Sequence, residues 1–444
     1  MFQRWLITLV LSFLFTTGMA QVQLISGLGQ EHIQDLAKDP AGNVYVLGSF
    51  ENNLLIGGEE IQSNGGSDMF LAKYDDNLSL QWVKSWGGKL DETAGQIVVT
   101  PTGSLMMTAH YEGPWVIEGR KLQALGKQHV TLLTLQPSGE VIHVAQLPGE
   151  GTFTSQALAT NMEGDRFLAL QYEGVMQVNG VRFAAPLGQP EVLLLKGTSS
   201  KEWDWARTFT GADREGNAQL ATDPSGGVFI ALTFSDRLDV GDESLTADGN
   251  SDFFLGHYSS AGLLNWYNRS WGAGHDRAHA ITTDPTGAVY VTGHFSQQIR
   301  IGGLEAASAS GNDMFIAKWN AAGKEEWLRV GSGGMGPDAG YAISWNEDML
   351  WVTGKYAEGI TFDTYSLEGA DDTEMFLATY ASNGVMNGLI RAGGNGMDKG
   401  KAVQLLPKDR VLLVGVFEGK TNVGGLPIES SDDQDAFLWL FDHE

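Results

Sequence analysis

Short runs of alternating apolar and polar residues follow one another along the chain, separated by glycine-rich turns. Between Asp68 and Tyr74, the side chains of Phe70 and Ala72 face one way and those of Leu71 and Lys73 the other, which is the two-residue period of a β-strand. Before another strand-like run, which starts at Val44, the segment Asp39-Pro-Ala-Gly42 has proline and glycine at the positions that a type I turn prefers. The pattern predicts strands joined by tight turns.

This pattern returns about every 61 residues. With Gly48 as the marker, the matching positions are Ala109, Leu170, Leu232, Gly293, Gly354 and Gly415. A fixed period across a whole chain indicates a repeat architecture. Each unit reads as four strands plus a small hairpin, such as the one around Gly57-Gly58. Four-stranded units repeated radially make a β-propeller, so we expect an all-β fold with seven blades.

The repeats leave no room for a second domain. We expect a signal peptide at 1–20 and a single propeller domain at 21–444. The expected blades cover roughly 28–88, 89–148, 149–210, 211–274, 275–333, 334–395 and 396–444 plus 21–27. The last unit lacks its fourth strand, and the segment from Gln21 to Ile25 is expected to supply it. That strand would close the ring and leave no open sheet edge.

Three columns of bulky residues in the aligned units are predicted to form the core, because each sheet must be covered by its neighbours on both faces. The first contains Phe70, Phe254, Phe315, Phe376 and Phe437. The second contains Tyr45, Met106, Phe167, Phe229, Tyr290, Trp351 and Leu412. The third contains Trp82, Trp205, Trp266 and Trp327.

The N-terminus and the charge bear on location and partners. Arg4, an apolar run from Trp5 to Phe15 and small residues before Gln21 are typical of a Sec signal peptide, so we expect export to the periplasm or the cell surface. The chain has no cysteine and a net charge of −26. This charge argues against nucleic acid and membrane insertion, and fits a cation or a basic partner. We expect a monomer.

Three motifs carry a resemblance to a known family. They are Asp-Pro-x-Gly-x-Val-Tyr-Val-x-Gly-x-Phe, Asp-x-Phe-x-Ala-Lys-Tyr and Trp-x-x-x-x-Gly-Gly. These motifs resemble the SBBP repeat, a seven-bladed β-propeller repeat common in exported proteins of Bacteroidota-like bacteria. The resemblance implies the fold and implies no catalytic residues and no agreed substrate.

Two sets of acidic residues are the candidate sites, and both are predicted at the long-loop end of the strands. The first precedes the first strand of the units, near the mouth of the central channel, and contains Asp91, Asp213, Asp276, Asp338 and Asp398. The second begins the third strand and contains Asp68, Glu191, Asp252, Asp313, Glu374 and Asp435. One interpretation is a negative mouth for cations or a basic ligand. The alternative, favoured by recurrence in nearly every unit, is that each carboxylate accepts backbone hydrogen bonds in its own turn.

Other candidate chemistry is weak. Asp371-Asp372 and Asp432-Asp433 offer oxygen ligands to calcium, but no EF-hand spacing supports them, so we expect no bound cofactor. His275 and His279 flank Asp276 and raise the question of a metal. The segment Gly331 to Gly336 matches a nucleotide-binding pattern without the strand and helix that it requires.

The sequence therefore predicts a non-catalytic, exported binding scaffold that recognises a protein or an envelope component through its long-loop face, with the first set of aspartates as its ligand-binding residues. A carbohydrate-binding propeller is the alternative. A polysaccharide hydrolase or lyase is a third interpretation, favoured if a cleft brings convergent carboxylates together with a basic or aromatic partner.

Overall fold

The computed structural model describes residues 21–27, 31–199, 202–213, 218–369, 372–431 and 434–443. All regular elements in these ranges are β-strands, which confirms the predicted all-β class. No helix that could cross a membrane occurs in them. The expected signal peptide, 1–20, lies outside the described residues.

The described strands pair into consecutive antiparallel units of four, numbered here in chain order. Unit 1 contains β2 (Glu31–Lys38), β3 (Val44–Phe50), β6 (Asp68–Tyr74) and β7 (Leu80–Trp86). Unit 2 contains β8 (Glu92–Val99), β9 (Leu105–Tyr111), β12 (His129–Leu135) and β13 (Val141–Gln146). Unit 3 contains β14 (Gly149–Thr160), β15 (Arg166–Val178), β17 (Glu191–Gly197) and β18 (Trp205–Ala212). Unit 4 contains β19 (Gln219–Thr222), β20 (Val228–Val240), β22 (Asp252–Tyr258) and β23 (Leu264–Trp271). Unit 5 contains β24 (Asp276–Thr283), β25 (Val289–Ile301), β26 (Leu304–Trp319) and β27 (Glu325–Gly333). Unit 6 contains β28 (Ala339–Asn346), β29 (Met349–Ala357), β32 (Thr373–Ala381) and β33 (Met386–Asn395). Unit 7 contains β34 (Lys399–Leu406), β35 (Arg410–Phe417), β38 (Asp435–Asp442) and β1 (Gln21–Gly27).

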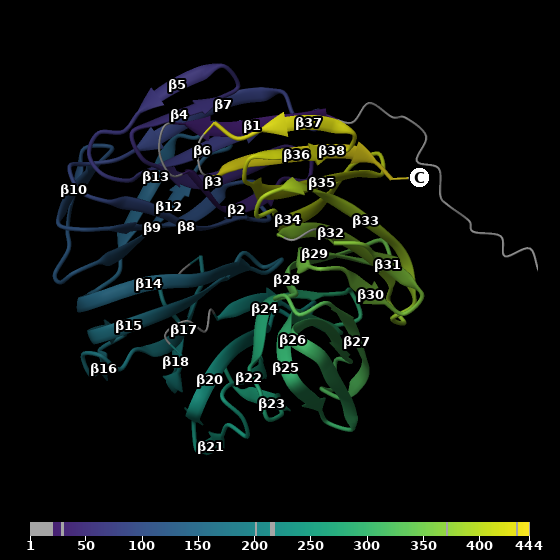
Figure 1. The fold of residues 1–444 in the computed structure, drawn as a ribbon. Coiled ribbons are helices and arrows are strands. Elements are labelled where there is room, and N and C mark those ends of the chain that lie inside the picture. The colour runs from purple at the N-terminus through teal and green to yellow at the C-terminus, as the bar shows by residue number, and fades with distance from the viewer. Residues whose placement is uncertain are drawn as a thin grey trace, which may run out of the picture.

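The first strands of the units lie toward the middle of the molecule, and the units are arranged around them (Figure 1). Consecutive first strands contact each other from β2 through β8, β14, β19, β24 and β28 to β34, and β34 also contacts β2. The molecule is therefore β-propeller-like.

The small hairpins between the second and third strands are present, and they have a role that the sequence did not predict. Their shorter strands are β4 (Asn53–Ile56), β5 (Glu59–Gln62), β10 (Pro114–Ile117), β11 (Arg120–Gln123), β16 (Val181–Ala185), β21 (Glu243–Thr246), β30 (Ile360–Phe362), β31 (Tyr365–Leu367), β36 (Lys420–Val423) and β37 (Leu426–Glu429). In several units this segment pairs with the last strand of the preceding unit, as β30 does with β27 and β36 with β33. Main-chain hydrogen bonds thus connect neighbouring sheets at their outer edges.

The N-terminal strand β1 lies in the sheet of unit 7. It pairs with β38 from Gln21 opposite Leu440 to Ile25 opposite Ala436. The other edge of β1 pairs with β4 of unit 1. Both edges of β1 are therefore hydrogen-bonded, one within unit 7 and the other to unit 1.

The hydrophobic core lies between neighbouring sheets. All members of the predicted Phe70 and Tyr45 columns are buried. In the third column Trp205 and Trp327 are buried, whereas Trp82 and Trp266 are only half-buried. Buried or half-buried, these indoles reach toward the next unit: Nε1 of Trp266 donates to the carbonyl of Ala321 at 3.1 Å. The equivalent bond of Trp327 goes to Ser382, also at 3.1 Å.

The predicted Asp-Pro-Ala-Gly turn is confirmed. The Gly42 amide donates to the Asp39 carbonyl at 2.9 Å, and Asp39 Oδ1 accepts the amides of Ala41 and Asn43 at 3.0 and 2.9 Å. The aspartate at this position thus orders the backbone turn through its side chain.

Candidate functional site

The first set of predicted site residues divides into buried and accessible members. Asp276, Asp338 and Asp398 are at most 1% exposed and lie where one unit follows another. Asp91 is exposed and accepts the Ser67 amide at 2.9 Å. Asp213 is half-buried and accepts the Ser235 hydroxyl at 2.8 Å. The ligand-binding role of the set stays a prediction, but three of its members do not reach the surface.

Burial controls the protonation of these inner acids. Burial raises the pKa of Asp276 and of Asp338 to about 8, and the nearby acids Asp252 and Asp313 contribute to the rise. Burial likewise raises the pKa of Asp398 to about 7. A carboxyl group in water has a pKa near 4, so these side chains keep a proton at a pH where free aspartate has lost it.

The second acid set behaves as turn acids in four units. One carboxylate oxygen accepts the amide of the residue four positions earlier, at 2.8 to 2.9 Å, in Asp68, Asp252, Asp313 and Asp435. Glu374 instead receives two hydrogen bonds from the Arg391 guanidinium, at 2.6 and 2.5 Å. Glu191 accepts the Tyr172 hydroxyl at 3.0 Å. Asp372 is exposed, and Asp371, Asp432 and Asp433 lie outside the described residues.

A group of basic and aromatic residues occupies the first strands instead. In six of these strands the pairing with the second strand shifts by at least one residue near the middle, which is a β-bulge. A bulge turns the extra side chain away from the regular alternation, and bulges are common beside active sites. The extra residues include Gln34, Gln96, Gln156, His279, Tyr341 and Lys401.

The last three of these bulge residues belong to what we call the axial cluster. The cluster contains Arg277, His279, His294, Tyr341, Lys355, Lys399 and Lys401. Its members come from β24, β25, β28, β29 and β34, which lie together toward the middle of Figure 1. The Tyr341 ring lies against that of His279, with centroids 5.2 Å apart, and so joins unit 6 to unit 5.

Two neutral histidines form the centre of the axial cluster. His279 Nε2 lies 2.7 Å from His294 Nδ1. Burial, followed by the charges of Arg277, Lys355 and Lys401, lowers the pKa of His279 to about 4. Burial and neighbouring groups that include Arg277 and Lys355 lower the pKa of His294 to about 3. Both imidazoles are therefore neutral at pH 7, and one donates its proton to the other across the short contact.

The lysines of the cluster repel one another. Lys401 is accessible to solvent, yet desolvation by the surrounding protein and the charges of Lys399 and Lys355 lower its pKa to about 8. Desolvation and Lys399 also lower the pKa of Lys355. Within the described part of the chain, Lys355, Lys399 and Lys401 form no ion pair. The cluster therefore concentrates positive charge in a protein whose net charge is −26.

The charge on this part of the molecule differs from the negative mouth that one interpretation of the sequence expected. The difference arises because Asp276, Asp338 and Asp398 are buried between units, whereas the neighbouring strand positions carry lysine, arginine and histidine. The bulge explains why the sequence pattern did not reveal the cluster, since it shifts these side chains out of the two-residue alternation. The sequence did contain one signal of the axial cluster. In the aligned repeats, one column holds glutamine in the early units and His279, Tyr341 and Lys401 in the later ones.

Other predicted chemistry is not supported. His275 is exposed and its ring lies 3.1 Å from the Ser251 hydroxyl, while His279 contacts His294. Among the described residues no group of three or more His, Cys, Asp or Glu side chains is arranged to hold a metal ion. The segment from Gly331 to Gly336 runs from strand β27 toward strand β28, with no helix after it, so the nucleotide-binding motif lacks its context.

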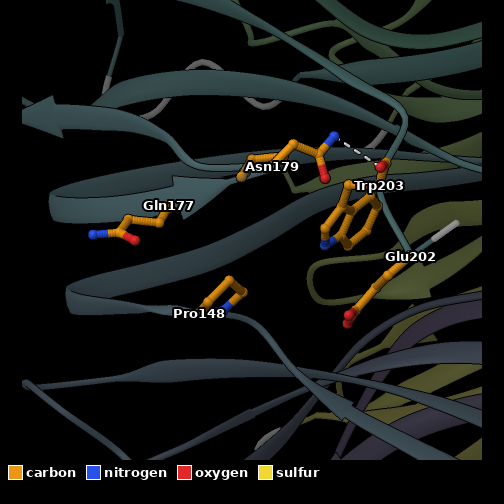
Figure 2. A pocket seen from close by; sticks show the side chains of 6 residues that line it. Pro148, Gln177, Asn179, Glu202 and Trp203 are labelled. Atoms are coloured by element: carbon orange, nitrogen blue, oxygen red, sulfur yellow. Dashed lines mark hydrogen bonds between the residues drawn. The ribbon is translucent and has the colours of Figure 1, made fainter.

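A separate hollow is lined by unit 3 and by the connection that leads into it (Figure 2). It has a volume of about 550 Å³ and is lined by Pro148, Gln177, Val178, Asn179, Glu202 and Trp203. The Asn179 amide donates to the Trp203 carbonyl at 2.9 Å. Glu202 is its single ionisable lining residue, so the hollow offers no pair of catalytic groups.

Comparison with known proteins gives neither a family nor a curated relative. No family model matches the chain, and no curated protein matches it. Membership of the SBBP family therefore stays a prediction.

Several solved structures are similar in fold. A protein of unknown function from Dyadobacter fermentans has a TM-score of 0.42 at 10% identity, over 96% of this chain and 99% of that one. The GH93 alpha-L-arabinofuranosidase of Fusarium graminearum has a TM-score of 0.40 at 11% identity, over 76% of this chain and 93% of the other. A GH43 protein of Bacillus licheniformis has a TM-score of 0.33 at 8% identity, over 93% and 97%.

These findings correct the predicted function. The sequence favoured a non-catalytic binding scaffold, but the similar structures are mainly enzymes: glycoside hydrolases, a sialidase and glucose dehydrogenase. Absent sequence motifs do not exclude an enzyme, because catalytic groups on a repeat fold can come from separate units and leave no local motif. At these identities and TM-scores no substrate or residue role is transferred to this chain.

Proposed function

We propose that this protein is a lyase that binds a carboxylate-bearing polysaccharide at the axial cluster and cleaves it by β-elimination. One observation carries the proposal: the neutral pair His279 and His294 lies among four basic side chains, those of Arg277, Lys355, Lys399 and Lys401. Neutral imidazole accepts protons, and the cations favour a negatively charged substrate.

The positive charge supports an anionic ligand. Collecting like charges lowers stability, so such a cluster is typical of a functional site. The acid whose negative charge would raise the pKa of Lys355 is Asp338. The pKa of Asp338 is about 8, so its carboxyl group is protonated at neutral pH. A carboxylate bound between these side chains would receive charge-assisted hydrogen bonds.

Elimination fits the side chains better than hydrolysis does. Glycoside hydrolases generally use two carboxyl groups that flank the scissile bond. Here the acids nearest to the cluster, Asp276, Asp338 and Asp398, are buried between units. The cluster itself offers partly exposed imidazole, phenol and guanidinium groups and the ammonium groups of its lysines.

The proposed reaction needs no water. An imidazole nitrogen of the His279–His294 pair takes the proton from the carbon next to the carboxylate. The electrons of that C–H bond form a carbon–carbon double bond, and the C–O bond to the next sugar breaks. Burial raises the pKa of Tyr341, so its phenol is protonated and donates a proton to the leaving oxygen. The basic side chains stabilise the charge that develops on the carboxylate.

Substrate binding would also prepare the base. The neighbouring cations contribute to the low pKa of His279 in the free protein. An anion beside them offsets their charge, which raises the pKa toward the working pH and makes the imidazole a better proton acceptor.

Purified protein should be mixed with polymers of galacturonate, glucuronate or mannuronate, and the ultraviolet absorbance of the new double bond followed. We expect His279→Gln to lower the rate by roughly 100-fold or more. Lys355→Met and Lys401→Met should weaken substrate binding, each by roughly tenfold.

Lys121→Met is the control, because Lys121 lies on the exposed hairpin β10–β11 and changes the net charge equally. Binding without absorbance change for every polymer would show that elimination is wrong. The absence of binding to all of them, with wild-type folding, would remove the anionic substrate as well.

We also propose that the units form a closed seven-bladed propeller. The pairing of β1 with β38, the contact of β34 with β2 and the shared core of units 7 and 1 support closure. Export, as predicted from residues 1–20, suits a polysaccharide substrate.

A further inference from the structure

The junction between units 4 and 5 buries two carboxyl groups without the hydrogen bonds that such groups require. Asp252 begins β22 and Asp276 begins β24, and neither is exposed. Asp252 Oδ1 and both oxygens of Asp276 have no hydrogen-bond partner among the described residues. The Ser270 hydroxyl lies near Asp276 and favours its charged form, and the same hydroxyl oxygen accepts the Phe253 amide at 3.0 Å. Unbonded carboxylate oxygens at this depth are strongly unfavourable unless another group binds them.

The equivalent junction between units 6 and 7 shows what compensates such a pair. There the buried Glu374 and Asp398 lie near each other, and the Arg391 guanidinium donates twice to Glu374. The strand position that matches Arg391 in unit 4 is Arg269, because each lies opposite the phenylalanine of the third strand.

Arg269 does not form that bond. Its guanidinium stacks on the Trp271 ring, 3.4 Å from the centroid, and donates to the Thr246 carbonyl. In the described part of the chain no ion pair joins Asp252 or Asp276 to a basic side chain. At the junction of units 4 and 5 the charge of Arg269 acts on Asp252, but no guanidinium forms a hydrogen bond to either acid in the described part of the chain.

Main-chain oxygen lies close to the carboxylates. A Cβ at Gly272 would lie 1.8 Å from the Gln298 carbonyl oxygen and 3.3 Å from Asp276 Oδ2. Glycine at 272 therefore lets this carbonyl and this carboxylate approach the same point. The combination of two carboxylates and backbone oxygen, with no thiolate, suits a hard cation that prefers oxygen ligands.

We propose that Asp252 and Asp276 bind one Ca²⁺ ion at the junction of units 4 and 5. The ion occupies the place that the Arg391 guanidinium takes at the junction of units 6 and 7. It stabilises the contact between the two sheets next to β24, which carries Arg277 and His279.

The test uses the full mature chain, first treated with chelator. Calcium binding is measured by calorimetry and by metal analysis after dialysis, and the melting temperature is compared with calcium, with magnesium and with chelator at pH 8. We expect one tightly bound Ca²⁺ per chain and a higher melting temperature with calcium than with chelator.

Asp252→Asn and Asp276→Asn should each weaken this binding by roughly tenfold or more. Asp398→Asn is the matched control, since it changes a buried acid of the same type where Arg391 supplies the charge. Wild-type protein that binds no calcium at pH 8, or that melts equally in calcium and in chelator, would overturn the proposal. Calcium binding that survives both Asn variants would overturn it too, because the many surface acids would then be the ligands.

Discussion

Gly323 and Trp266 show how single residues join neighbouring units. Gly323 has a φ of +81°, which glycine adopts without strain, and Nε1 of Trp266 donates to a carbonyl of the same turn. The Asn268 side chain also donates to the Gly323 carbonyl, at 2.7 Å. An added Cβ at 323 would lie 2.5 Å from the indole. The glycine thus serves both the turn and the contact with the preceding unit.

We expect Gly323→Ala to lower the free energy of unfolding by about 2–4 kcal/mol, of which about 1–2 kcal/mol is the cost of a positive φ. Gly58→Ala is the control, because Gly58 has a φ of +85° and a Cβ added there would have no other atom within 4 Å. Urea denaturation measures both. Equal losses in the two variants would mean that the contact with Trp266 contributes nothing.

At the scale of elements, β1 decides how the two ends of the chain meet. It is the fourth strand of unit 7 and also pairs with the hairpin strand β4 of unit 1. Removing it would leave β38 with an unpaired edge, and Ile25, which is fully buried, would leave the core between units 7 and 1. An open edge of this kind favours association with other chains.

A chain that begins at Glu31 should therefore melt at a lower temperature and form oligomers, as measured by differential scanning fluorimetry and light scattering. A synthetic peptide with the sequence from Gln21 to Gly27 should restore part of the stability by strand addition. A peptide with the same composition in scrambled order is the control. If the truncated chain kept the melting temperature of the full chain and stayed monomeric, the proposed role of β1 in closing the ring would be wrong.

At the scale of the whole molecule, the buried acids at the unit junctions act together on stability. Burial raises the pKa of Glu92 and Asp398 to about 7, and that of Asp276 and Asp338 to about 8. In the unfolded chain the same groups have a pKa near 4. Between these values the folded protein binds more protons than the unfolded chain, so its stability decreases as the pH rises.

In chelator, these groups should make the melting temperature highest near pH 4 to 5. From there up to pH 8 we expect it to fall by roughly 5–10 °C in total. Thermal denaturation across this range is the measurement. A double variant, Asp276→Asn with Asp338→Asn, should show a shallower fall, because its amides do not titrate. A melting temperature that rises from pH 5 to pH 8 would contradict the assignment.

The sequence by itself determined the regular part of this protein. The 61-residue period, the Asp-Pro-x-Gly turns and the Phe70 and Tyr45 columns predict the strands, their order and their buried faces, because a strand records its environment in a local two-residue pattern. The tertiary structure decided what these strands bring together. His279, Tyr341 and Lys401 lie about 60 residues apart and meet through bulges, which interrupt that pattern. Whether Asp276 faces solvent or a second buried acid depends on the preceding unit of the fold, which supplies Asp252, and no local pattern encodes that contact.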